Sequence, residues 1–355
     1  MAHIDAEVIR AGYDLLDLDI HGLIKSRCGS FVLKTNVHFP TDINLLYDSI
    51  RYLIHGCVKW NEQSPLPGWQ QHQYNLRKFK ELYRKIQKPR HSTAKDELKK
   101  QAKKDEIRQA HPAYIDLAHL YLTRTNLSHA ILKNDHKIPD ALLAKAFTFD
   151  GHAERQIDQI RRRAIQGETI PHAEKVFSLF QPHTEWISKG KPGVPVELGL
   201  RVAIVESSIG FILHHQVMQN TTDDKISVDI VKETQALFPS FKAFSFDKGF
   251  HSPGNQKDLK DFLGQVTLPK KGKLSVADKT REYDDDFKQA KRQHSAVESA
   301  INALEVHGLD KCPDHGNEGF KRYVALAVLS RTIQILGSIK RSIERQRPQE
   351  QKQAA

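Results

Sequence analysis

Two apolar runs that follow each other almost without interruption constrain the fold of this chain most strongly. "LGLRVAIVES" (198–207) and "GFILHHQVMQ" (210–219) are rich in Val, Ile and Leu, and the short "SIG" separates them. Runs of this length and composition are typical of β-strands, and so short a connection joins antiparallel neighbours. The sequence therefore predicts a β-hairpin here.

The segments after this hairpin alternate between helical and strand patterns. Residues 224–238 predict a helix, "AFSFD" (243–247) a strand, and "HSPGNQKDLKDFL" a helix that opens after a serine and a proline. "QVTLP" predicts another short strand, and a helix follows that ends at Gly308. With an earlier strand in "SFVLKTNVHFPTD" (30–42), this order predicts the α/β class, with a mixed sheet flanked by helices.

A large helical insertion follows the first predicted strand. "INLLYDSIRYLI" has apolar residues at helical spacing, and the segment after it is dense in Lys and Arg, with a break near Pro89. We expect four parts: 1–42 with an N-terminal helix and the first core strand, 43–170 as the helical insertion, 171–340 as the remainder of the core, and 341–355 as a flexible tail.

The charge balance indicates a polyanionic partner. Lys and Arg number 54 against 43 Asp and Glu, which gives a net charge of +11. Nucleic acid is the commonest such partner. A helical scaffold protein that ignores nucleic acid stays open as an alternative.

Three cysteines favour a reducing cytoplasm over a disulfide framework. The acidic, amphipathic N-terminus is not a signal peptide, and no apolar run approaches the roughly 18 residues that would predict a membrane partner.

Asp247 ends a buried strand, where a carboxylate needs a cation, a metal or water. Glu298 follows on the helix whose apolar stripe includes Val297 and Ile301, so the helix would hold it near the sheet edge where ligands gather. Two carboxylates brought together repel unless a divalent cation lies between them. Mg²⁺ suits oxygen ligands, and we expect Mn²⁺ to substitute.

Several long segments resemble a known family. "SFDKGFHSPGNQ", "LPKKGKLS", "RQHSAVESAINALEVHGLDKCPDHG", "FSLFQPHTEWISKGKPGVPVELGLRV" and "KTNVHFPTDINLLYDSIR" resemble bacterial insertion-sequence transposases of the DDE type, over about residues 20–340. The resemblance implies an RNase H-like core that uses two metal ions to cut the inverted-repeat ends of an element and join them to target DNA. It implies Asp247 as the second catalytic, metal-holding acid and Glu298 as the last. A homo-oligomer in the bacterial cytoplasm, associated with the nucleoid, is expected.

The first acid of this family is missing. Similar transposases read Arg-Cys-Asp-Ser ahead of the first strand, and here "RCGS" places Gly29 at the acidic position. Asp42 and Glu206 are weaker substitutes. The resemblance also implies a longer N-terminal helical part than this sequence shows, and the expected alternative is a truncated, inactive remnant that only binds DNA.

Other residues are candidates for contacts with DNA. We expect phosphate contacts from lysines in two loops, base stacking from Trp186, and an approach to the scissile phosphate from Arg292 and His294. The loop lysines are Lys189, Lys191, Lys270 and Lys271. His307, Cys312 and His315 invite a zinc interpretation, but they lack a fourth ligand and clean spacing.

Overall fold

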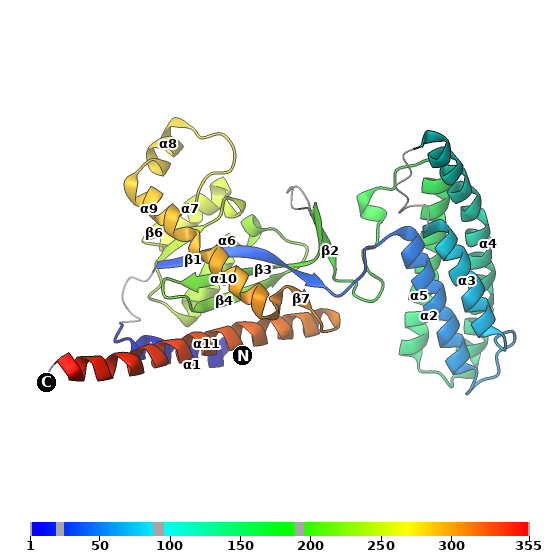
Figure 1. Cartoon of the computed structure of the whole chain (residues 1–355), viewed down its shortest axis with the longest axis horizontal. Coiled ribbons are helices and arrows are strands. Elements are labelled where there is room, and N and C mark those ends of the chain that lie inside the picture. Colours follow the sequence, from blue (N-terminus) through cyan, green and yellow to red (C-terminus); the bar gives the residue numbers. More distant parts are fainter. Residues whose placement is uncertain (1, 19–24, 88–95, 189–194, 354–355) are drawn as a thin grey trace. The chain divides into compact units, whose positions relative to one another are not determined.

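The computed structural model describes residues 2–18, 25–87, 96–188 and 195–353 (Figure 1). The chain divides into two compact units. The sheet unit comprises Met1–Val37 and His183–Ala355, and the helical unit comprises His38–Pro182. A helical unit is thus inserted into the chain of the sheet unit.

The sheet unit contains strands and helices from both ends of the chain. Its strands are β1 (Lys25–Thr35), β2 (Glu185–Ser188), β3 (Val196–Ser207), β4 (Ile212–Met218), β5 (Ala243–Phe246), β6 (Gln265–Thr267) and β7 (Lys311–Cys312). Its helical segments are α1 (Ala2–Leu15), α6 (Asp223–Leu237), η4 (Lys248–Phe250), α7 (Pro253–Phe262), α8 (Val276–Glu282), α9 (Asp285–His294), α10 (Ala296–Leu304), η5 (Glu305–Leu309) and α11 (Gly316–Gln353).

Within the described ranges, the sheet is mixed and has seven strands. Strand β3 lies antiparallel to β1 on one side, and β2 and β4 pair antiparallel with β3 on its other side. Beyond β1 the sheet continues with β5 and then β6, both parallel to their neighbours, while the short β7 pairs with the far end of β1. The α/β class with a mixed sheet is therefore confirmed.

Helices cover both faces of this sheet because the strands alternate their apolar side chains. On β1, Cys28 packs into the core with α1, α6 and α7, whereas Phe31 and Leu33 pack into the core with α10 and the first half of α11. Successive side chains of a strand point to opposite faces, so apolar residues at neighbouring positions show that β1 is buried on both faces. Gly29 belongs to the face that α10 covers.

The helical unit packs four helices around its own apolar core. They are α2 (Asp42–Trp60), α3 (His72–Gln87), α4 (Glu97–Asp135) and α5 (Asp140–Ile160), followed by the short η2 (Arg161–Ile165) and η3 (His172–Glu174). A polar pair lies among the buried residues of this unit: the His129 Nδ1 atom is 2.7 Å from Asp150 Oδ2, and both side chains are buried. The pair satisfies two polar groups that are costly to bury alone.

A hydrogen bond in the sheet unit joins the two ends of the insertion. The Thr35 and Thr184 hydroxyl oxygens lie 2.9 Å apart, and both side chains are buried. The chain therefore leaves the sheet unit and returns to it at the same place.

The local sequence signals succeed for most elements. The 198–219 hairpin is confirmed as β3 and β4, and the helix that opens after a serine is confirmed as α7. There the Ser252 hydroxyl accepts a hydrogen bond from the Asn255 N–H, and Pro253 occupies the first turn. Gly308 ends α10 through the π-helical turn η5 with φ +116°, a conformation that favours glycine.

Two boundaries differ from the sequence prediction. The first strand is Lys25–Thr35 and not 30–42, so Gly29 lies inside it and not ahead of it. Helix α11 runs to Gln353, where the sequence predicted a flexible tail from 341. The short strands β2 and β7 were not predicted.

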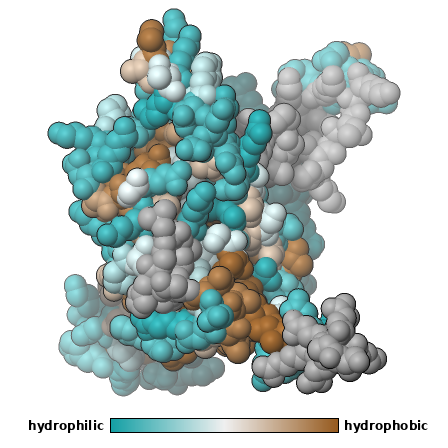
Figure 2. Space-filling view, turned by 90° about the vertical axis from the view of Figure 1, so that its left-hand side faces the viewer, coloured by the Kyte–Doolittle hydropathy of each residue, from teal (hydrophilic) through white to brown (hydrophobic). Residues whose placement is uncertain are grey.

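The surface is predominantly polar where it can be seen. Figure 2 shows one face of the molecule, which is largely hydrophilic with apolar areas of limited extent. Across the described ranges, no helix combines the length and apolar character that crossing a bilayer requires.

Candidate active site at the end of strand β5

Asp247 follows the last residue of β5 directly, at the carboxyl end of the parallel pair β1–β5. The final paired residues are Cys28 and Phe246, so one further step in register places Asp247 beside Gly29. The chain then turns, because the Phe250 N–H donates to the Asp247 carbonyl at 3.1 Å. The Asp247 side chain is 46% exposed. The carboxylate at the strand tip is therefore accessible to solvent and ligands.

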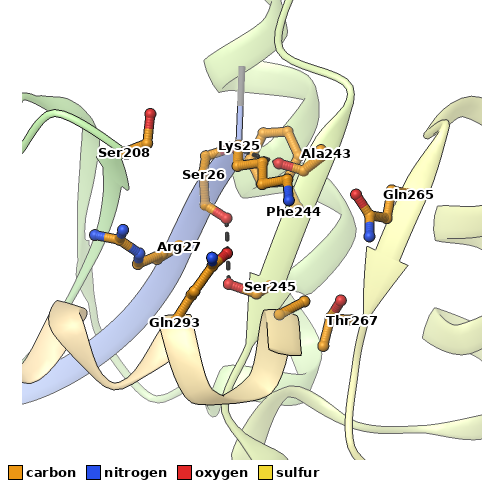
Figure 3. Close-up of a pocket in the computed structure, with 11 residues that line it drawn as sticks. Lys25, Ser26, Arg27, Ser208, Ala243, Phe244, Ser245, Gln265, Thr267 and Gln293 are labelled. Atoms are coloured by element: carbon orange, nitrogen blue, oxygen red, sulfur yellow. Dashed lines mark hydrogen bonds between the residues drawn. The ribbon is translucent and has the colours of Figure 1, made fainter. Parts of the chain in front are cut away.

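His294, at the end of α9, holds Asp247 in place. Its Nε2 atom lies 3.1 Å from Asp247 Oδ1, and its Nδ1 atom lies 3.0 Å from the Ser245 hydroxyl. The Ser245 hydroxyl also lies 3.3 Å from the carbonyl oxygen of Ser26 on the neighbouring strand β1. Figure 3 shows Ser26 and Ser245 close together. The His294 side chain is only 9% exposed. The two contacts of His294 within the protein suit a residue that positions Asp247, while an approach to a scissile phosphate stays a prediction.

The geometry allows both protonation states of His294. In the neutral ring, Nε2–H donates to Asp247, and Nδ1 accepts from the Ser245 hydroxyl. In the charged ring, Nδ1–H donates to the Ser245 oxygen, which can in turn donate to the Ser26 carbonyl. The hydrogen bond to Asp247 is kept in either case.

Glu298 lies one turn beyond His294, in the first turn of α10. Its side chain is exposed, while its neighbours Val297 and Ile301 are buried against β1 and fix the orientation of the helix. Figure 1 shows α10 beside β1. The helix thus covers the sheet face toward which Gly29 points.

The space at Gly29 is already filled. A Cβ atom built on Gly29 would lie 3.0 Å and 3.1 Å from the two methyl carbons of Val297 and 3.5 Å from Ile301 Cδ1. Glycine supplies no ligand oxygen, and its missing side chain lets α10 pack closely on β1. An aspartate here would require α10 to shift by a few tenths of an ångström.

Asp223, the first residue of α6, is a nearby carboxylate that the sequence analysis did not identify. Its Oδ2 atom lies 2.8 Å from where a Cβ of Gly249 would be, two residues after Asp247. Burial is the main cause that raises the pKa of Asp223, and the charge of Asp247 adds to the shift against the Ser30 hydrogen bond and Arg201. An acid that opens a helix in "TTDDK" is common, so the sequence carried little signal for it.

Neither proposed substitute for the first acid is free. Asp42 belongs to the helical unit and forms a bidentate pair with Arg163, at 2.6 Å and 3.0 Å. Glu206 is buried on β3, opposite Arg27, whose Nη1 atom lies 3.2 Å from Glu206 Oε2. Burial raises the pKa of Glu206, and Arg27 opposes that shift. Both carboxylates already have cationic partners.

The donor type at the site suits Mg²⁺, but the number of ligands is small. Asp247 and Glu298 offer carboxylate oxygens, and neither side chain pairs with a Lys or Arg in the part of the chain that the structure describes. Within the same ranges, no group of three or more His, Cys, Asp and Glu residues is arranged to hold a metal ion. This also removes support for zinc at His307, Cys312 and His315.

The predicted DNA contacts differ in their environments. Lys270 is tied to helix α8, because its ammonium pairs with Asp278 and its backbone N–H donates to Glu282 Oε1 at 2.7 Å. Lys271 and Arg292 are exposed. Trp186 is half-buried on β2 and is engaged in contacts. Lys189 and Lys191 lie outside the described residues.

A cavity of about 260 Å³ adjoins the Ser245 end of this hydrogen-bonded chain. Figure 3 shows Ser245, Thr267 and Gln293 around it, from β5, β6 and α9. Asp247 and Glu298 are not among its lining residues. The cavity is therefore separate from the predicted metal site.

Comparison of the chain with protein-family models, with curated proteins and with solved structures gives no match.

Proposed function

We propose that this chain is a DDE-type insertion-sequence transposase, which cuts the ends of its element and joins them to target DNA. The observation that carries the proposal is the position of Asp247 at the carboxyl end of β5, one register step from Gly29 and on the sheet face that α10 covers. The strand order also supports it: three antiparallel strands, β4, β3 and β1, continue into the parallel β5 and β6. This order is compatible with an RNase H-like core.

In this proposal Asp247 and Glu298 hold Mg²⁺, or Mn²⁺ in its place. The bound ions supply activation of the attacking oxygen and stabilisation of the leaving oxygen. His294 keeps the Asp247 carboxylate oriented, and α10 presents Glu298. Water attacks at the element ends, and the freed 3′-hydroxyl then attacks the target DNA.

A second candidate is a remnant that binds DNA and no longer cuts it. Gly29 favours this function, because it supplies no oxygen and the Val297 methyl groups lie 3.0 Å and 3.1 Å from its absent Cβ. The two candidates share the fold and the DNA partner and differ in catalysis alone.

Nicking of a supercoiled plasmid that carries the DNA flanking the gene tests the two candidates. The wild-type chain, Gly29→Asp, Asp247→Asn and the double variant are compared in Mg²⁺ and in Mn²⁺. We expect Asp247→Asn to lower any nicking rate at least about 100-fold, since loss of an outer-shell partner of a metal alone costs about 10–100-fold.

Each outcome has a distinct meaning. Nicking by the wild-type chain that depends on Asp247 supports the transposase. Nicking only by Gly29→Asp, lost again in the double variant, supports the remnant. Nicking that does not respond to Asp247→Asn in any background contradicts the metal site that both candidates share.

A further inference from the structure

The outward face of α3 concentrates positive charge. The inward face is fixed by three buried residues, Asn75, Phe79 and Ile86. The Phe79 ring stacks on Tyr114 of α4 with centroids 4.7 Å apart, which fixes the rotation of the helix about its axis. The face of α3 opposite to these buried residues therefore points to solvent.

Five cations and one acid occupy residues 77–85 of this helix. All six side chains are exposed. They are Arg77, Lys78, Lys80, Arg84, Lys85 and Glu81. The cations extend over about 12 Å of the helix axis at 1.5 Å per residue. We call these five cations the α3 basic face.

Three arginines elsewhere in the helical unit pair with acids. Arg163 pairs with Asp42, Arg51 with Asp48, and Arg162 with three acids. In contrast, no ion pair joins any member of the α3 basic face to an acid within the described part of the chain. An ordinary solvated helix carries acids three or four residues from its cations, and here a single acid serves five. The charge is thus left available for an external anion.

We propose that the α3 basic face binds the phosphate backbone of double-stranded DNA. This inference rests on the proposed function, and it names the surface of the helical unit that holds the DNA. Each strand of duplex DNA carries one charge per about 3.4 Å of axis, so a 12 Å row of cations spans about three or four phosphates of a strand. Contacts of this kind position the protein without reading sequence.

Salt-dependent binding of the full chain to a labelled 30-base-pair duplex in EDTA tests this inference. The test variant is Arg77→Gln/Lys80→Gln/Arg84→Gln. The matched control, Lys133→Gln/Arg155→Gln/Lys175→Gln, removes the same charge from three exposed, scattered positions of the helical unit. Circular dichroism and thermal melting establish that both variants are folded.

We expect the slope of log affinity against log salt to fall by up to about 2.7 in the test variant, since each phosphate contact contributes about 0.9. The control is expected to keep the wild-type slope. Equal losses in both variants, an unchanged slope in the test variant, or wild-type binding to anionic lipid vesicles but not to DNA would each overturn the inference.

The result separates from that of the nicking assay, because EDTA excludes metal-dependent cutting. If the test variant has a reduced salt slope and no variant nicks DNA, the proposal that the α3 basic face binds DNA is supported and the transposase proposal is rejected. If nicking depends on metal but the salt slope of the test variant is unchanged, the transposase proposal is supported and the DNA-binding role of the α3 basic face is rejected.

Discussion

Substitution of Gly29 by aspartate tests the arrangement around Asp247 independently of any DNA substrate. The new side chain would enter the contact between β1 and α10, where the Val297 methyl carbons lie 3.0 Å and 3.1 Å from the Cβ position. Its carboxylate would face the same edge of the sheet as Asp247. Two effects of opposite sign are therefore expected, one from packing and one from metal binding.

The packing effect is a loss of stability. Overpacking a core costs about 1–3 kcal/mol. For a domain of about 150–250 residues, each kcal/mol shifts the melting temperature by about 2–4 °C. In EDTA, Gly29→Asp is expected to lower the melting temperature of the sheet unit by about 2–12 °C. Gly29→Ala is the matched control, because it brings the same Cβ contact without the charge.

The metal effect restores stability. A cation that binds only the native state stabilises it by about 2.7 kcal/mol at 100 times its dissociation constant. With the conversion above, saturating Mg²⁺ is expected to raise the melting temperature of Gly29→Asp by about 5–11 °C. The wild-type chain and Gly29→Ala are expected to gain clearly less, since each lacks one carboxylate.

Thermal melting monitored by circular dichroism, in EDTA and over a series of Mg²⁺ concentrations, measures both shifts in melting temperature. The reasoning fails if Mg²⁺ stabilises Gly29→Asp no more than Gly29→Ala. Position 29 would then not share a cation with Asp247, and the missing acid would have to be sought elsewhere.

Three further predictions concern stability. Replacement of buried His294 by Ala removes its hydrogen bonds to Ser245 and Asp247 and its buried ring, so we expect a loss of about 1–3 kcal/mol in urea unfolding, against less than about 0.5 kcal/mol for exposed Arg292→Ala. Ser252→Ala removes the cap of α7 and is expected to cost about 1 kcal/mol, whereas Ser295, whose side chain does not cap α10, is the control in the same assay. Burial raises the pKa of Asp5 to about 6, so the native state binds this proton more tightly than the unfolded chain. The resulting contribution of Asp5 to the free energy of unfolding is fully present below about pH 4, and about 3 kcal/mol of it is lost as the pH rises through 6. We expect Asp5→Asn to flatten this part of the plot of stability against pH. An unchanged plot would contradict the assignment.

Periodicity in the sequence located the main elements of the sheet unit, because each element buries an apolar face and its apolar residues recur at a regular spacing within a short stretch of sequence. The start of β1 was missed since "KSRCG" contains polar residues and a glycine, and only pairing with β3 and β5 makes it a strand. The two-residue β7 and the four-residue β2 were missed for the same reason. Strand pairing is a non-local property that a window of residues does not contain.

The candidate site was predictable in part. The position of Asp247 at a strand end follows from "AFSFD" alone. The role of His294 did not, because its hydrogen bonds reach 47 and 49 residues back along the chain. Asp223 was missed because an acid at a helix start has an ordinary local explanation.

The bond between Thr35 and Thr184 gives the insertion an unusual freedom. Both ends of the inserted chain are held at one place in the sheet unit. The length of the insertion therefore affects the folding free energy of the sheet unit only through the entropy of loop closure. That entropy changes by about 0.6 kcal/mol for each doubling or halving of the loop. A gene that loses residues 38–182, or exchanges them for another helical module, would therefore still encode a foldable sheet, so that the helical and sheet-forming parts are free to evolve at separate rates.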